Sequence, residues 1–153
     1  MLYFIRIIVV IFFICIAATF GIILCIIRPF NPYNLKIIAQ IMKYGNNILG
    51  IEVDLRNKQN FAPHPSIIVS NHHENMDVFI GAYTLPEKTF TIGKKAILFI
   101  PFFGLFYWLS GNILINRNNK KSAYNTMDEV AEKLITQKIS IWVLAEGTRS
   151  KGR

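Results

Sequence analysis

Residues Ile7 to Ile27 form a run of twenty-one residues without a charge, rich in isoleucine and phenylalanine. At a rise of about 1.5 Å per residue, a helix of this length crosses roughly 30 Å of hydrocarbon. We therefore expect a transmembrane helix or signal anchor. A cleaved signal peptide is the alternative, but the run is longer than an ordinary signal core and no Ala-x-Ala site follows it. Cys15 and Cys25 both lie inside this run, so we expect neither a disulfide nor a metal site from them.

The rest of the chain is long enough for one domain. Of its 153 residues, 52% are hydrophobic and the mean hydropathy is +0.36, which suits a protein with one part in lipid. We expect residues 1–28 to form the anchor, residues 29–49 a juxtamembrane helix, and residues 50–153 the domain itself.

The charge balance favours anionic partners. Seventeen Lys and Arg against nine Asp and Glu give a formal charge of +8, which suits phospholipid head groups, phosphorylated substrates or nucleic acid. Since the sequence contains no nucleic-acid-binding motif, we expect no nucleic-acid partner. Arg28, Lys36 and Lys43 follow the apolar run, whereas only Arg6 precedes it. This bias predicts a single-pass anchor with the domain on the cytoplasmic side, which in a bacterium is that of the inner membrane.

Short strands and helices alternate along the remaining chain, which predicts an α/β fold around a central mixed sheet. The expected strands are 51–55, 67–69, 88–94, 112–116 and 140–144. The expected helices are 35–45, 78–85 and 122–136, with a proline-containing loop at 58–65.

Residues 96–109 are almost wholly apolar, but they are too few to span a bilayer and contain Pro101 and Gly104. Two interpretations remain open: a packed core helix, or a helix that contacts an acyl chain or the membrane interface. In either case, the proline predicts a kink.

A histidine and an aspartate lie five residues apart where the expected strand 67–69 ends. His72 should emerge at this strand end, which is where open α/β sheets place their chemistry. The Asp77 carboxylate could fix the imidazole tautomer and stabilise the imidazolium, while the other ring nitrogen takes a proton from a hydroxyl.

Three segments together carry a family resemblance. Asn71, His72 and Asp77 form a His-x-x-x-x-Asp pattern, the segment from Gly111 to Arg117 reads GNILINR, and Glu146 to Ser150 reads EGTRS. In this order they resemble the first three motifs of the glycerolipid acyltransferases that convert lysophosphatidate to phosphatidate. The resemblance runs from Ser70 to Ser150.

This resemblance implies a role for each motif. His72 would be the general base for the acceptor hydroxyl, Asp77 would orient it, and Asn71 would be auxiliary. The phosphate of the acceptor would be bound by the second and third motifs, through Gly111, Arg117, Glu146, Gly147, Thr148 and Arg149. Two arginines can hold a phosphate by forked hydrogen bonds, and Gly147 permits close approach of the backbone.

Weaker candidates complete the expected site. Lys94 and Lys95 could contact a phosphate or a lipid head group. We expect no metal site at His72, His73 and Glu74. Adjacent residues of an extended segment point to opposite sides, and no third ligand is evident elsewhere in the sequence. His64, in a loop with prolines on both sides, is expected to be exposed.

The resemblance also implies the reaction and its partners. The acyl donor would be acyl-CoA or acyl carrier protein, the acceptor lysophosphatidate in a phospholipid membrane, and no cofactor would be needed. Other acceptors are alternatives: glycerol 3-phosphate, another lysophospholipid, or an acylated amino acid such as lyso-ornithine lipid. Family members continue beyond the third motif, so we expect a C-terminally incomplete domain. A truncated, non-catalytic protein that binds anionic lipid is the rival from another class.

Overall fold

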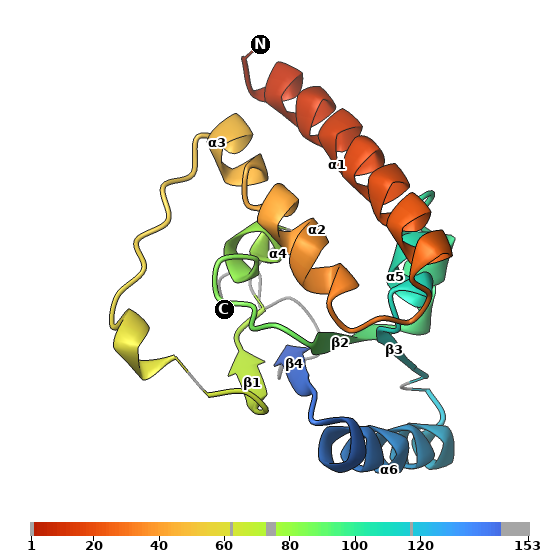
Figure 1. Cartoon of the computed structure of the whole chain (residues 1–153). Coiled ribbons are helices and arrows are strands. Elements are labelled where there is room, and N and C mark those ends of the chain that lie inside the picture. Colours follow the sequence, from red (N-terminus) through yellow and green to blue (C-terminus); the bar gives the residue numbers. More distant parts are fainter. Residues whose placement is uncertain (1, 62, 73–75, 117, 145–153) are drawn as a thin grey trace.

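A computed structural model of the chain describes residues 2–61, 63–72, 76–116 and 118–144 (Figure 1). The α-helices are α1 (Leu2–Ile27), α2 (Asn34–Met42), α3 (Gly45–Leu49), α4 (Asp77–Gly81), α5 (Phe103–Leu109) and α6 (Lys120–Gln137). Two 3₁₀ helices are η1 (Lys58–Asn60) and η2 (Lys95–Phe99). The strands are β1 (Ile67–Ser70), β2 (Thr89–Lys94), β3 (Ile113–Ile115) and β4 (Ser140–Leu144).

The four strands form one sheet in the order β1-β4-β2-β3. The α/β class is confirmed, but the sheet is not mixed: the three strand pairs that the structure describes are all parallel. The reason lies in the connections, because each one from strand to strand contains a helix that returns the chain to the same edge of the sheet. The carboxyl ends of all four strands therefore lie along one edge.

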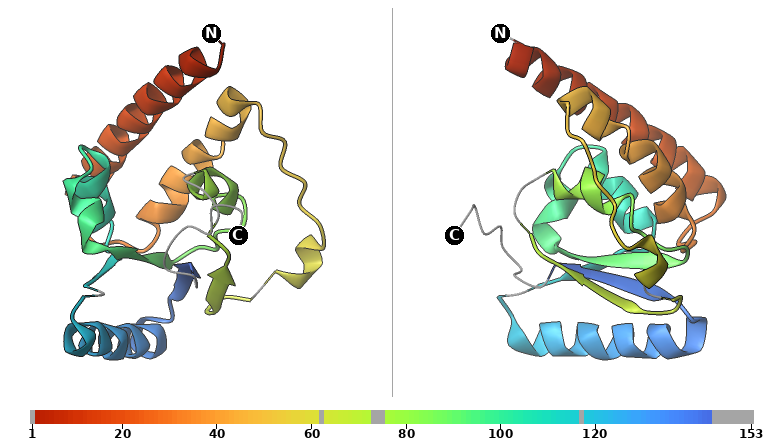
Figure 2. Two further views of the ribbon diagram at one scale, coloured as in Figure 1. Left: turned by 180° about the vertical axis from the view of Figure 1, so that it is seen from behind. Right: turned by 90° about the vertical axis from the view of Figure 1, so that its left-hand side faces the viewer.

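Helices cover both faces of the sheet, as Figure 2 shows. On one face, Phe90 of β2 and Ile141 of β4 pack with Val130 of α6 in a small core. On the other face, Trp142 packs against a larger core that α1, α2, α4 and α5 share. Neighbouring residues of β4 thus serve opposite cores, as the two-residue period of a strand requires.

Helix α1 contributes to this larger core and also has an apolar outer surface. Val10, Ala17, Ala18 and Cys25 are buried, whereas twelve of its large apolar side chains are exposed. Residues 3–27 are long and apolar enough to cross a membrane. The helix begins before the expected Ile7 and includes Arg6, whose guanidinium donates a hydrogen bond to the carbonyl oxygen of Leu49.

The two elements after α1 differ from the sequence prediction. The expected helix 35–45 is two helices, α2 and α3, because the chain turns at Lys43 and Tyr44. The expected strand 51–55 is wrong, since these residues form neither strand nor helix. Their alternating burial is nevertheless present, with Ile51, Val53 and Leu55 half-buried. The alternating pattern therefore predicted which side chains face the protein. It did not predict whether another strand pairs with this backbone.

The apolar segment 95–109 is interrupted rather than merely kinked. It folds as η2 followed by α5, with Pro101 and Phe102 between them. Phe102 has φ +59°, which is uncommon for a residue with a side chain. The two helices pack so tightly that a Cβ on Gly104 would lie 2.5 Å from the carbonyl oxygens of Ile97 and Leu98. Only glycine fits at this crossing.

Candidate active site

The site begins where β1 ends. β1 finishes at Ser70, the exposed Asn71 follows, and His72 comes next, at the carboxyl edge of the sheet. Helix α4 begins with Asp77. The strand and the helix together bring two side chains from neighbouring sequence into contact.

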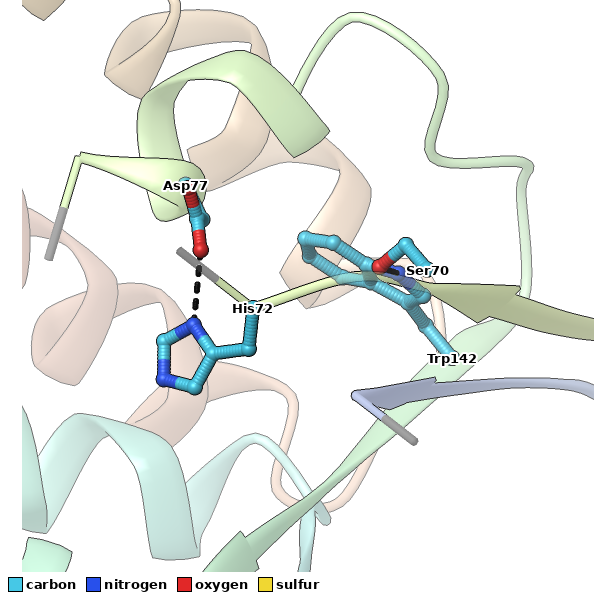
Figure 3. A network of polar contacts seen from close by, with 4 residues as sticks. All are labelled: Ser70, His72, Asp77 and Trp142. Atoms are coloured by element: carbon cyan, nitrogen blue, oxygen red, sulfur yellow. Dashed lines mark hydrogen bonds and ion pairs between the residues drawn. The ribbon is translucent and has the colours of Figure 1, made fainter. Parts of the chain in front are cut away.

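The side chains of His72 and Asp77 are in direct polar contact. The Nδ1 atom of His72 lies 2.7 Å from the Oδ2 atom of Asp77, and their side chains are only 22% and 18% exposed (Figure 3). Because a carboxylate can only accept, the imidazole donates from Nδ1. A neutral ring then carries its lone pair on Nε2, which is the form that a general base requires.

A second hydrogen bond supports the segment that leads to His72. The indole Nε1 of Trp142 donates to the hydroxyl of Ser70 at 2.8 Å (Figure 3). The same indole lies against α4, because a Cβ on Gly81 would come within 1.9 Å of its ring. Trp142 thus contacts both elements that hold the pair, and Gly81 leaves the room for it.

A largely apolar cavity of about 700 Å³ adjoins the pair. Its lining includes His72 and Asp77, together with residues of α1, α2, α4, β2, η2, α5 and β4. Lys94, at the carboxyl end of β2, is exposed and also lines it. Lys95 is exposed but does not line it. The volume is that of a ligand site rather than of a packing defect.

One wall of the cavity is fixed by a buried polar network. The Thr91 hydroxyl donates to the Tyr107 hydroxyl at 2.6 Å, and the Thr91 amide donates to the Asn112 side-chain oxygen at 2.7 Å. Asn112 in turn donates to the Ser110 hydroxyl. Burial raises the pKa of Tyr107, so its hydroxyl stays neutral. These residues and Trp142 were not predicted, because single polar residues among apolar ones give no local signal.

The predicted phosphate-binding residues are placed only in part. Gly111 has φ +85° and precedes β3, where it lines a separate cavity of about 230 Å³ beside α6 rather than the one with His72. Arg117, Glu146, Gly147, Thr148 and Arg149 lie outside the described residues. The strands that precede them end at Ile115 and Leu144, and Leu144 is the register partner of Ser70.

The other candidate groups lie away from the pair or outside the described residues. His64 is exposed as predicted, and its Nδ1 lies 2.8 Å from the Ser140 hydroxyl, before the amino end of β1. His73 and Glu74 are not described. In the parts of the chain that the structure describes, no three histidine, cysteine or carboxylate groups gather as a metal site would need.

Comparison with known proteins decides the family. The family described as Acyltransferase matches residues 52–153, which include both motif residues of the pair. The chain belongs to this acyltransferase family. No solved structure matches it significantly.

Several curated relatives of the chain are named 1-acyl-sn-glycerol-3-phosphate acyltransferase. The Escherichia coli protein is 36% identical over 154 residues, covering the whole chain and 63% of the relative. The Haemophilus influenzae protein is 35% identical over 154 residues, covering the whole chain and 64% of the relative. The human alpha form is 35% identical over 134 residues, covering 87% of the chain and 47% of the relative. The chain therefore spans less than two thirds of these proteins.

The shared hydrogen bond of Ser70 and Trp142 can be tested by a double-mutant cycle. Ser70→Ala removes the acceptor and should lower the free energy of unfolding by about 1 kcal/mol. Trp142→Phe removes the donor and part of a packed ring, so it should lower it by more. The double variant should lose little more than Trp142→Phe alone, because both changes remove the same bond. Denaturant unfolding in detergent micelles measures this, with Tyr124→Phe on exposed α6 as a neutral control. Fully additive losses would contradict the coupling.

Proposed function

We propose that this chain carries the catalytic pair of a 1-acyl-sn-glycerol-3-phosphate acyltransferase. It would move a fatty acyl group from acyl-CoA or acyl carrier protein to the sn-2 hydroxyl of lysophosphatidate, giving phosphatidate. The observation that carries the proposal is the 2.7 Å contact between His72 Nδ1 and Asp77 Oδ2 beside a large apolar cavity. The names of the relatives support the substrate.

In the proposed reaction, the pair moves one proton. The Nε2 atom of His72 accepts the proton of the acceptor hydroxyl while the hydroxyl oxygen attacks the thioester carbonyl carbon. The new C–O bond forms, the carbonyl electrons collect on oxygen, and the C–S bond then breaks as the carbonyl re-forms. The leaving thiolate takes the proton from the imidazolium. Asp77 stabilises that imidazolium throughout, and no cofactor is needed because the thioester is already activated.

Removal of the pair gives the first test of this function. His72→Ala should lower kcat by about 10²–10⁴-fold, and Asp77→Asn should also lower it, because the carboxamide favours the wrong tautomer. His64→Ala is the matched control, since this histidine is exposed and lies beyond the opposite end of β1. Release of free thiol from the acyl donor in the presence of lysophosphatidate is the readout. Equal loss in the His64 variant would argue against the assignment, and lipid binding without turnover in the parent would indicate the non-catalytic rival.

We also propose that Arg117 and Arg149, with Glu146, Gly147 and Thr148, bind the acceptor phosphate, without Gly111, which precedes β3 and lines the other cavity. The support is the motif resemblance and the placement of β3 and β4, which both end at the edge that carries His72. Asn71, Lys94 and Lys95 are auxiliary, and Lys94 lines the cavity next to the pair.

Replacement of one arginine should therefore act on the acceptor. Arg149→Gln or Arg117→Gln should raise the KM for lysophosphatidate about 10–100-fold, as expected for loss of a charge-assisted hydrogen bond. Lys121→Gln removes the same charge from an exposed position on α6 and should leave the KM unchanged. Initial rates at varied acceptor concentration measure both. A similar KM for neutral and phosphate-bearing acceptors would exclude a phosphate site.

The apolar cavity is proposed to hold a fatty acyl chain. Leu35 of α2 lines it, whereas Ile37 of the same helix is similarly half-buried but does not. Leu35→Trp should therefore lower kcat/KM for long acyl donors more than for short ones. Ile37→Trp should leave this ratio unchanged. Rates with donors of graded chain length report the ratio, and the same profile for both variants would place the acyl chain elsewhere.

We propose further that α1 is a single-pass anchor and that the domain lies on the cytoplasmic side, because the basic residues Arg28, Lys36 and Lys43 follow it. Cysteines at two exposed positions test this topology: Tyr3→Cys near the start of α1, and Tyr124→Cys on α6. In sealed cells, an impermeant thiol reagent should label the first, and the second only after permeabilisation. Labelling of both only after permeabilisation would show that α1 enters the bilayer without crossing it.

A further inference from the structure

The outward side of η2 and α5 is apolar and exposed. Five side chains make up this surface, which we call the apolar ridge: Leu98, Phe99, Phe102, Leu105 and Trp108, exposed by 43%, 87%, 54%, 49% and 47%. They lie on one short segment rather than being scattered, so the ridge is unlike the single exposed apolar residues of ordinary surfaces. None of the five lines the cavity that contains His72.

The ridge continues the exposed surface of α1 near the end of that helix. The ring of Phe106 on α5 packs against Gly21, and the amide of Phe30 donates to the carbonyl oxygen of Leu109 at 3.0 Å. The exposed ring of Phe30 also meets that of Trp108, with centroids 5.7 Å apart. Figures 1 and 2 show α5 beside the C-terminal half of α1 in every view.

This position corresponds to a particular depth in a bilayer. Gly21 lies six residues before the last residue of α1, Ile27, and six residues of helix rise about 9 Å. Interfacial apolar faces are buried to about 5–10 Å. If α1 is in the membrane, α5 therefore lies at the level where head groups meet acyl chains.

The composition of the ridge suits that level. Phenylalanine and tryptophan are its main residues, and aromatic side chains concentrate at membrane interfaces. Lys94 and Lys95 are exposed directly before it, and no Asp or Glu occurs from Lys88 to Met127. Lysines at the edge of an apolar surface attract anionic lipid.

We propose that the apolar ridge is a second membrane-contact surface, inserted at the interface of an anionic bilayer beside α1. This proposal rests on the proposed membrane insertion of α1, but not on the acyltransferase chemistry. The inward side of the same segment, through Ile97, Phe103 and Phe106, lines the cavity. A single layer of chain thus separates lipid from the cavity that adjoins His72.

The depth of Trp108 tests the proposal directly. The full chain is incorporated into vesicles of phosphatidylcholine and phosphatidylglycerol in which a fraction of the phosphatidylcholine carries bromine on its acyl chains. Bromine near the glycerol end should quench the tryptophan fluorescence more strongly than bromine near the methyl end. Trp108→Phe should abolish most of this quenching, because the remaining Trp142 is partly buried against the larger core and is not part of the ridge.

The outcomes separate the two proposals. A chain that does not float with the vesicles refutes the insertion of α1. Alternatively, the chain floats while aqueous iodide quenches Trp108 as strongly with vesicles as in detergent-free buffer without them. This result would refute the proposal that the ridge contacts the membrane. Vesicle-bound dimers that shield Trp108 from both iodide and brominated lipid would also refute it, and would identify a second copy as the occupant.

A pair of variants tests what the contact does. Phe99→Ser with Leu105→Ser removes apolar surface from the ridge and should lower turnover of vesicle-borne lysophosphatidate about tenfold, with little change for detergent-dispersed substrate. Ile135→Ser with Tyr124→Ser removes similarly exposed apolar side chains from α6 and should change neither rate. An equal loss in detergent, or in the α6 variant, would contradict a membrane role.

Discussion

The parallel pairing of β4 with both β1 and β2 is the constraint on which the site depends. β1 carries the segment to His72, β2 carries Lys94 to the cavity, and β4 joins these strands into one sheet. Through Trp142, β4 also contacts Ser70 and the helix that begins with Asp77. The 2.7 Å contact of the pair is therefore supported by the pairing of β1 with β4 and by the contacts of Trp142.

Sequence patterns predicted the elements best where they reflect local chemistry. The apolar run 140–144 gave the bounds of β4, and the His-x-x-x-x-Asp spacing gave the contact between His72 and Asp77.

The predictions failed where the outcome depends on distant partners. The alternation at 51–55 matched the burial but no strand lay beside it, and parallel pairing followed from connections that no single pattern encodes. In the sequence, Trp142 is indistinguishable from any other buried strand residue. Its contact with Ser70 could not be predicted, because the two residues are far apart in the sequence. Likewise, a motif alone could not show that Gly111 lines a different cavity.

Helix α1 carries an exposed apolar surface of membrane-spanning length and is also part of the domain core. Its small residues Ala17 and Ala18 are buried against the domain, and Gly21 accepts the ring of Phe106. Twelve of its large apolar residues are exposed on the outer side. A helix that only tethered the domain would have no need of these contacts. The exposed apolar surface and the cavity involve the same helices, so under the proposed membrane insertion a substrate dissolved in the bilayer would have a short path to His72.

The central place of β4 also determines when the sheet can assemble during synthesis. β1 is complete at residue 70, yet the neighbour that satisfies its backbone is translated about seventy residues later, as residues 140–144. Until then β1 lacks β4, its neighbour in the sheet that the structure describes, although α1 has already emerged. If α1 inserts as proposed, it reaches the bilayer before β4 has been made. A ribosomal stall before residue 140 would then leave β1 without β4, with an open strand edge that is prone to misassociation.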